Sequence, residues 1–174
     1  MATVPLPHQF AVGEAVTSVN LNSYYSGISF LQNPPIFKSL TNTTQSIGTS
    51  FTTVNWNASV YDTYSGHSNV TNNSQYIAQV AGYYFIYSIV PIGATTTAAL
   101  VVAVAVNGTQ VPGSATSSAP TPGALAVTSG IGATTVFLNV GDIVTIQALA
   151  TVATNTLISG TPFTPSFEVV WMHV

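Results

Sequence analysis

The chain has 174 residues, of which 47% are apolar and only 3% charged, with a formal net charge of −3 and no cysteine. The length suits one domain with its own core, and high hydrophobicity with low charge is the opposite of a disordered composition. A single basic residue excludes the clustered cations that contact nucleic acid, and the lack of cysteine excludes disulfides, thiolate metal sites and cysteine nucleophiles.

The first predicted element is an amphipathic helix over Thr17–Leu31. Thr17 or Ser18 suits its N-cap, and Asn33-Pro34-Pro35 ends it because proline lacks an amide donor. One short helix cannot bury its apolar side alone, so we expect it to dock on the sandwich, a symmetry mate or another protein. The residues on this side, which we assign to assembly, are Leu21, Tyr24, Tyr25, Ile28 and Leu31.

From Phe51 onward, β-branched and aromatic residues dominate and turn signals recur, a pattern typical of short strands. The predicted strands are Phe51–Trp56, Ala58–Tyr61, Tyr76–Val80, Tyr83–Val90, Ala98–Val106, Thr134–Asn139, Ile143–Ala150 and Phe167–Val174. Asn107-Gly108 is the strongest hairpin signal, because both residues tolerate a positive φ. Residues 113–123 and 151–165 are predicted to be irregular loops.

This pattern predicts an all-β protein: a jelly-roll β-sandwich of about 8–10 strands with a short N-terminal arm and one helix. We assign residues 1–45 to the arm and helix, for anchoring or assembly, and residues 46–174 to the jelly-roll domain. The longest apolar run, Ala98–Val106, is too short for a membrane-spanning helix of about 20 residues, so no membrane insertion is expected.

Two of the predicted strands are apolar on both faces, namely Leu100–Val106 and Tyr83–Val90. An antiparallel sheet normally shows polar residues on the face that meets water. The second apolar face is therefore expected to be covered by other copies of the chain, at about 25 cal/mol per Å² of buried apolar area. The strand residues assigned to assembly are Tyr83, Phe85, Tyr87, Val102 and Val104.

Titratable residues are few and dispersed, and no catalytic, metal-binding or phosphate-binding motif is present. Asp142 follows Gly141 between two strands, where an aspartate more often bonds its own backbone than serves as a metal ligand or catalytic acid. The sequence therefore predicts no enzyme, no cofactor and no metal. The alternative is an enzyme such as a glycan depolymerase, which would use Asp62, His67, Asp142 or Glu168.

A carbohydrate-binding module is a further alternative, because sugar sites use aromatic faces with polar side chains. The candidate ligand-binding residues are Trp56, Tyr61, Asp62, Tyr64 and His67. Asp62–His67 could also hold a metal or another ligand. The competing interpretation is that the aromatic residues belong to the core and that Asp62 and His67 belong to a polar loop.

Three stretches of the second part, Tyr76–Ser88, Val104–Thr109 and Val136–Ile146, resemble the globular head of complement-type and tumour-necrosis-factor-like jelly rolls. In that superfamily an "aGxYxF" strand, an "NG" hairpin and an "L..GD.V.l" strand come in this order. The resemblance spans residues 50–174. It implies a ten-stranded jelly roll that trimerises with apolar strands facing the threefold axis. The calcium-site acids of some members are missing here, so no metal is carried over.

The N-terminal part resembles proteins of actinobacterial phages and prophages that are commonly labelled minor tail or virion structural proteins. The matching residues are Phe10–Glu14, Leu21-Asn22, Phe30–Pro35, Gln45–Ile47 and Asp62–His67. The resemblance implies that residues 13–35 anchor the protein and that the jelly roll projects outward. The basic residues usual in that helix are absent from Leu21–Leu31, which leaves the anchoring partner open.

Together these features predict a homotrimeric virion protein of a bacteriophage, in the tail, baseplate or fibre tip, whose jelly roll contacts the host surface or reinforces the shell. Its expected partners are copies of itself, other virion proteins and a host cell-surface glycan. One alternative is a capsid decoration or head fibre protein that stabilises the shell. Another is a secreted lectin-like module, although the N-terminus lacks the pattern of a secretory signal.

Overall fold

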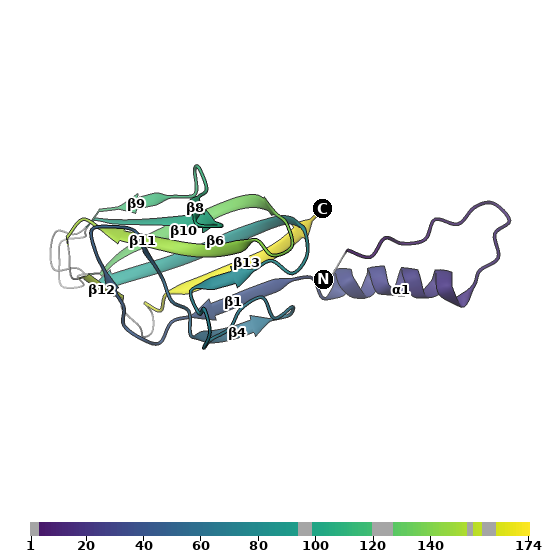
Figure 1. Ribbon diagram of the computed structural model, residues 1–174, viewed down its shortest axis with the longest axis horizontal. Coiled ribbons are helices and arrows are strands. Elements are labelled where there is room, and N and C mark those ends of the chain that lie inside the picture. The colour runs from purple at the N-terminus through teal and green to yellow at the C-terminus, as the bar shows by residue number, and fades with distance from the viewer. Residues whose placement is uncertain (1–3, 94–98, 120–126, 153–154, 158–162) are drawn as a thin grey trace.

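The protein is a sandwich of two antiparallel sheets, from one end of which a helix and an extended arm project (Figure 1). The computed structural model describes residues 4–93, 99–119, 127–152, 155–157 and 163–174. The expected all-β jelly roll with one short helix is confirmed. No helix in the described ranges has the length and apolarity needed to cross a bilayer.

The first sheet, sheet A, has seven strands and carries the longest ones. Along it run β2 (Ser46–Ile47), β12 (Asn155–Leu157), β6 (Gly82–Gly93), β13 (Ser166–His173), β1 (Ile36–Leu40) and β4 (Ala58–Asp62). β10 (Val127–Leu138) pairs with β6 along its whole length. Because β13 and β10 both pair with β6, residues far apart in the sequence lie side by side across this sheet.

The second sheet, sheet B, has six strands and covers the other side of the core. Its path is β3 (Thr52–Thr53), β11 (Ile143–Ala150), β7 (Leu100–Val106) and β8 (Thr109–Gln110); β5 (Gln75–Ile77) pairs with β11, and β9 (Thr116–Ser118) pairs with β7. The predicted hairpin is confirmed: Asn107, at φ 52°, and Gly108, at φ 82°, join β7 to β8.

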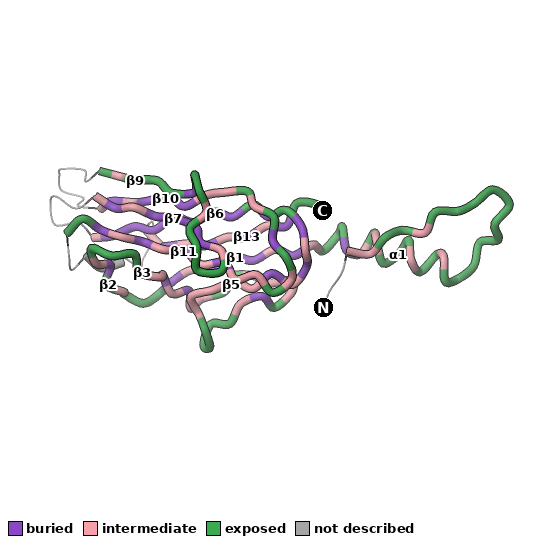
Figure 2. The backbone as a smooth tube through the Cα atoms, turned by 45° about the horizontal axis from the view of Figure 1, so that its top comes forward, coloured by how far each residue is buried: buried purple, intermediate pink, exposed green. Residues whose placement is uncertain are grey.

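The core between the sheets is rich in aromatic rings. Phe37 of β1 is fully buried, and its ring centroid lies 5.2 Å from those of both Tyr76 and Phe167. Trp56 is fully buried against Phe167, with centroids 5.5 Å apart. Figure 2 shows buried backbone concentrated in the strands, whereas the arm and helix are mostly exposed. Rings at these separations pack in the favoured tilted and edge-to-face arrangements.

The predicted helix is confirmed as α1 (Ser18–Gln32). The Oγ1 of Thr17 accepts a hydrogen bond from the amide of Asn20 at 3.3 Å, so Thr17 is the N-cap. Only Phe30 of this helix is buried, and its ring meets Trp171 of β13 edge to face at 4.9 Å. The helix therefore touches the sandwich at its C-terminal end alone and extends away from it (Figure 1).

Several strands lie where the sequence predicted none. β1 lies within residues 1–45, which were assigned to the arm and helix, and it pairs with β13 and β4. Its polar Lys38 and Ser39 hide the strand pattern. The predicted loop at 113–123 contains β9 and the one at 151–165 contains β12; the remaining parts of these loops lie partly outside the described residues. Such two- and three-residue strands depend on their partners, not on their own sequence.

Candidate functional site

The outer face of sheet A is open and apolar, and we call it the open face. On β6, Tyr84 and Ile86 point into the core, whereas Tyr83 and Phe85 are each 41% exposed on the other side. Tyr87 continues the same side and is half-buried. The expectation of a strand apolar on both faces is thus met on β6. An exposed aromatic row of this kind marks an interaction surface in soluble proteins.

Neighbouring strands extend the open face across the sheet. Phe137 of β10 pairs with Tyr83, and their rings meet edge to face at 5.3 Å. On the other side of β6, the ring of His173 packs on Tyr83 at 5.0 Å, and Val170 pairs with Phe85. These flanking residues were not among the predicted assembly residues. Alternate residues of β10 and β13 point to the same side of the sheet. This alternation assigns them to the open face only once the pairing of both strands with β6 is known.

One charged cluster interrupts the open face. Nζ of Lys38 lies 3.6 Å from Oε2 of Glu168, and the hydroxyl of Tyr61 donates to Oε1 of Glu168 at 2.6 Å. Partial burial, together with this bond to a carboxylate, raises the pKa of Tyr61 to about 12. The three residues come from β1, β13 and β4, which the register aligns. These three side chains form a polar cluster in a face that otherwise carries almost no charge.

Two residues assigned to assembly do not fit that role. Val102 and Val104 of β7 are fully buried between the sheets. A Cβ added at Gly130 of β10 would come within 2.5 Å of Val102, which shows how tightly β7 packs against the opposite sheet. Every position of β7 is apolar. The sequence pattern therefore does not distinguish the positions that face the core from those that face outward.

The five candidate ligand-binding residues do not form one accessible surface. Trp56 belongs to the core, Tyr61 lies on the open face, and the Tyr64 ring lies 6.3 Å from Phe30 at the helix junction. Asp62, the last residue of β4, accepts hydrogen bonds from the amides of Gly66 and His67 in the loop that follows. The physical reason for this correction is that only Tyr61 and Asp62 share a strand, where neighbouring side chains point to opposite sides, whereas the other three residues lie in the connections before and after it.

His67 is held by backbone groups of two other segments. Its Nδ1 lies 2.7 Å from the carbonyl oxygen of Gln75, and its Nε2 lies 3.1 Å from the carbonyl oxygen of Trp56. Both ring nitrogens are therefore engaged in fastening the loop to the core. Asp62 and His67 thus have the structural roles of a polar loop, as the competing interpretation of this segment expected.

Asp142 joins two turns at one end of the sandwich. Its Oδ1 accepts from Asn107 Nδ2 at 2.9 Å, and its Oδ2 accepts from the amide of Asn139 at 2.7 Å. In return, Asn107 Oδ1 accepts from the amide of Ile143 at 2.9 Å. The bond from Asn107, supported by that from Asn139, lowers the pKa of Asp142. This geometry is that of a turn aspartate.

We expect Asp142→Ala to weaken the fold at neutral pH and to reduce its acid sensitivity. Because the folded-state pKa is lowered from 3.8, the stabilisation by the carboxylate is complete above that value and disappears as the pH falls through the lowered one. Asp142 is half-buried and its partners Asn107 and Asn139 are exposed, so we expect a loss of about 1 kcal/mol or less at neutral pH. Urea unfolding near neutral pH and near pH 2 measures it; an equal difference from wild type at both values would contradict the prediction.

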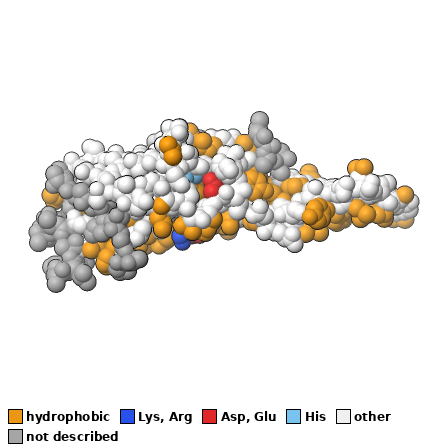
Figure 3. Space-filling model, turned by 90° about the horizontal axis from the view of Figure 1, so that it is seen from below, with side chains coloured by type: hydrophobic (Ala, Val, Ile, Leu, Met, Phe, Trp, Pro, Cys, Tyr) orange, Lys and Arg blue, Asp and Glu red, His pale blue; other side chains and the backbone are white. Residues whose placement is uncertain are grey.

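The arm and helix form a hairpin held by Glu14. Its carboxylate accepts from the amide of Ala11 at 2.9 Å and from Asn20 Nδ2 at 2.9 Å, and it lies 2.6 Å from Nε2 of His8. These bonds, the one from Ala11 first, lower the pKa of Glu14. Phe10 stacks on Tyr24 with centroids 5.8 Å apart. The arm thus covers one side of α1, and Figure 3 shows hydrophobic side chains along this projection.

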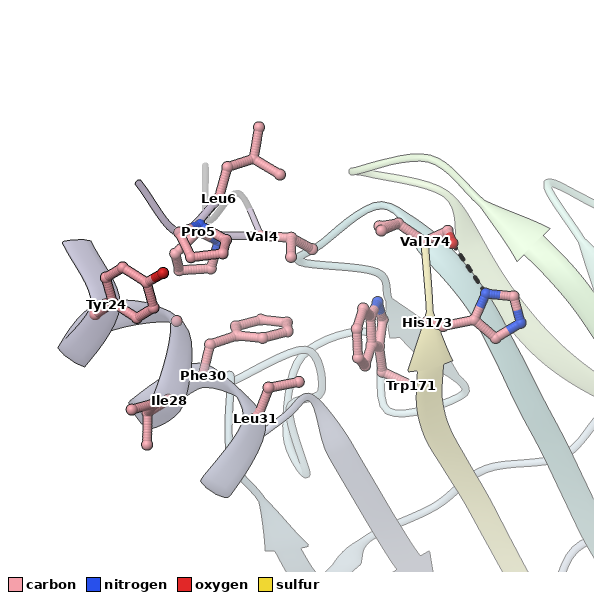
Figure 4. Close-up of a pocket in the computed structure, with 12 residues that line it drawn as sticks. Val4, Pro5, Leu6, Tyr24, Ile28, Phe30, Leu31, Trp171, His173 and Val174 are labelled. Carbon is pink, nitrogen blue, oxygen red and sulfur yellow. Dashed lines mark hydrogen bonds between the residues drawn. The ribbon is translucent and has the colours of Figure 1, made fainter. Parts of the chain in front are cut away.

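An apolar cavity of about 430 Å³ lies where the projection meets the sandwich (Figure 4). Val4 and Pro5 of the arm, Ile28 and Leu31 of α1, and the C-terminal Val174 contribute to its lining. In the part of the chain that the structure describes, no three His, Asp or Glu side chains gather as a metal site. The exposed apolar residues of the open face and of α1 form the candidate site, an assembly surface.

No protein-family model matches the sequence, and no curated protein does. Among solved structures, the globular domain of zebrafish complement 1qA protein is similar, with a TM-score of 0.59, 16% identity, and coverage of 80% of this chain and 98% of that chain. Murine APRIL crystallised at pH 8.0 has a TM-score of 0.54 and 20% identity, covering 79% of this chain and 98% of that one. These similarities show the fold alone, a jelly-roll sandwich like that of the two proteins.

Proposed function

We propose that this chain is a non-enzymatic structural protein of a bacteriophage particle, which assembles as a homotrimer through the open face and sits in the tail, baseplate or fibre tip. The observation that carries the proposal is the row of exposed Tyr83, Phe85 and Phe137 on the outer side of sheet A. A lone molecule would leave this row in water, and threefold contact buries it.

The fold supports the same arrangement. The jelly-roll resemblance implies trimers whose apolar strands face the threefold axis, and in this chain the candidate strands are β6 and β10. Charge supports it further, because the open face has little charge to repel an identical face. Lys38 and Glu168 already neutralise one another there. When the open faces of two copies meet, a charge pair of this kind selects their relative orientation. It adds less to the affinity between the copies.

The virion assignment is supported by the N-terminal resemblance to phage structural proteins. The residues that carry it have structural roles here: Glu14 holds the arm against α1, and Asp62 and His67 fasten the loop after β4. We propose that the helix end of the molecule faces the particle and that the opposite end of the sandwich points outward, toward the host surface.

Labelling of intact phage particles with an antibody against this chain tests the location. The expected result is label at the tail, baseplate or fibre tip. Label spread over the head would replace this location with the alternative of a capsid decoration protein, and absence of the chain from purified particles would overturn the virion assignment. Native mass measurement of the purified chain tests the trimer: the expected mass is three chains of 18.0 kDa, about 54 kDa.

A further inference from the structure

The helix α1 carries an apolar seam that stays largely exposed among the described residues, although Phe10 of the arm stacks on the Tyr24 ring within it. We define the seam by Leu21, Tyr24, Ile28 and Leu31. Their spacing of three, four and three residues is that of the core positions of a coiled coil. Leu21, Ile28 and Leu31 are 54%, 51% and 69% exposed. The spacing therefore fits a second helix better than it fits a flat sheet.

The other sides of α1 are already accounted for. The arm covers the side of Ser23 and Gly27, where Ser23 Oγ donates to the carbonyl of Leu6 at 3.0 Å and Pro5 approaches Gly27. A third side is polar and exposed, and includes Asn22 and Ser26. No residue of α1 is charged. The seam lies between the arm side and the polar side, and it would meet an identical seam without electrostatic repulsion.

The seam continues into the open face of the sandwich. Ile28 and Leu31 line the same cavity as His173 (Figure 4), and the His173 ring packs on Tyr83 of the open face. Only Asn33-Pro34-Pro35 separates α1 from β1, and prolines limit the freedom of this link. A copy that covers the open face of its neighbour therefore brings its own seam close to that of the neighbour.

We propose that the occupant of the seam is the same helix of the other two copies, so that three α1 helices form a stalk continuous with the trimeric head. This inference rests on the proposed homotrimer. A 15-residue helix is marginal as an isolated unit, and two heptads bind weakly. Assembly of the heads supplies the missing affinity, because short tethers raise the effective concentration of the helices to the millimolar range.

Disulfide crosslinking tests the stalk without background, because the full-length chain has no cysteine. Ile28→Cys places a thiol in the seam. Ser26→Cys places one on the polar side of the same helix, two residues away and nearly opposite around the axis, and is the matched control. Under mild oxidation at low protein concentration, we expect at least a tenfold faster formation of crosslinked dimers for Ile28→Cys. Native mass and circular dichroism of both reduced variants are measured in parallel.

The outcomes separate the two proposals. A trimeric mass with fast crosslinking of Ile28→Cys alone supports the stalk. A trimeric mass with slow or equal crosslinking of both variants overturns the stalk, leaves the trimeric head intact, and assigns the seam to a different protein. A monomeric mass of both reduced variants and of the wild type overturns the homotrimer and the stalk together.

Discussion

Replacing Phe85 with aspartate is expected to convert the trimer into monomers. Phe85 lies in the middle of the open face, between Thr135 of β10 and Val170 of β13. In a trimer the substitution would place three unpaired carboxylates in an apolar interface, and an uncompensated buried charge costs about 3–5 kcal/mol. Association should weaken at least a hundredfold. Native mass spectrometry or light scattering should then give 18.0 kDa.

The matched control for Phe85→Asp is Thr109→Asp. Thr109 is exposed on β8 of the other sheet, so its carboxylate stays in water in either state. Because Phe85 points away from the core, circular dichroism should show that both variants keep the fold. If Phe85→Asp stays trimeric, the contact between copies uses another surface, and the role of the open face is wrong.

Replacing Trp56 with alanine is expected to produce the largest loss of stability. The side chain is fully buried against Phe167, and its Nε1 has no hydrogen-bond partner among the described residues, so it stabilises the fold through packing. Removing a buried tryptophan leaves a large cavity and typically costs 3–5 kcal/mol. Urea unfolding at one fixed protein concentration measures the change, because association also stabilises the folded state.

The same experiment separates two functions for Trp56. Val70→Ala is the control, since Val70 is 90% exposed and its truncation should change the free energy of unfolding by about 0.5 kcal/mol or less. A sugar-binding tryptophan would lie at the surface, and its loss would change ligand affinity with little effect on unfolding. If Trp56→Ala unfolds like wild type, Trp56 does not belong to the aromatic core.

Much of the open face could be predicted from one strand. Residues 83–90 place apolar side chains on both faces of the strand. One face packs on the core, so the other indicates a second buried surface. Tyr83, Phe85 and Tyr87 follow directly from that pattern. Phe137 could not be assigned in the same way, because it belongs to β10, a strand far from β6 in the sequence. Only the pairing of Phe137 with Tyr83 places the two on one face.

The misassigned residues share one physical cause. Val102 and Val104 come from a strand that is apolar at every position, so its period cannot distinguish the core from the surface. Trp56 and His67 were grouped with Tyr61 because they are near in sequence, but the strand and loop around them send the side chains in different directions. In the structure, Trp56 and His67 are joined through a backbone carbonyl, not through a shared ligand surface.

By itself, the sequence determined the fold class, the helix with an N-cap at Thr17 or Ser18, the Asn107-Gly108 hairpin and the presence of a second apolar strand face. These features depend on local periodicity, on φ preferences and on the near absence of charge. Only the tertiary structure decided which apolar residues remain exposed, that β1 belongs to the sandwich, and that Lys38, Glu168 and Tyr61 meet. The pairing between distant strands decides which of the two alternating sets of side chains on each strand faces the core. The local sequence pattern does not carry this information.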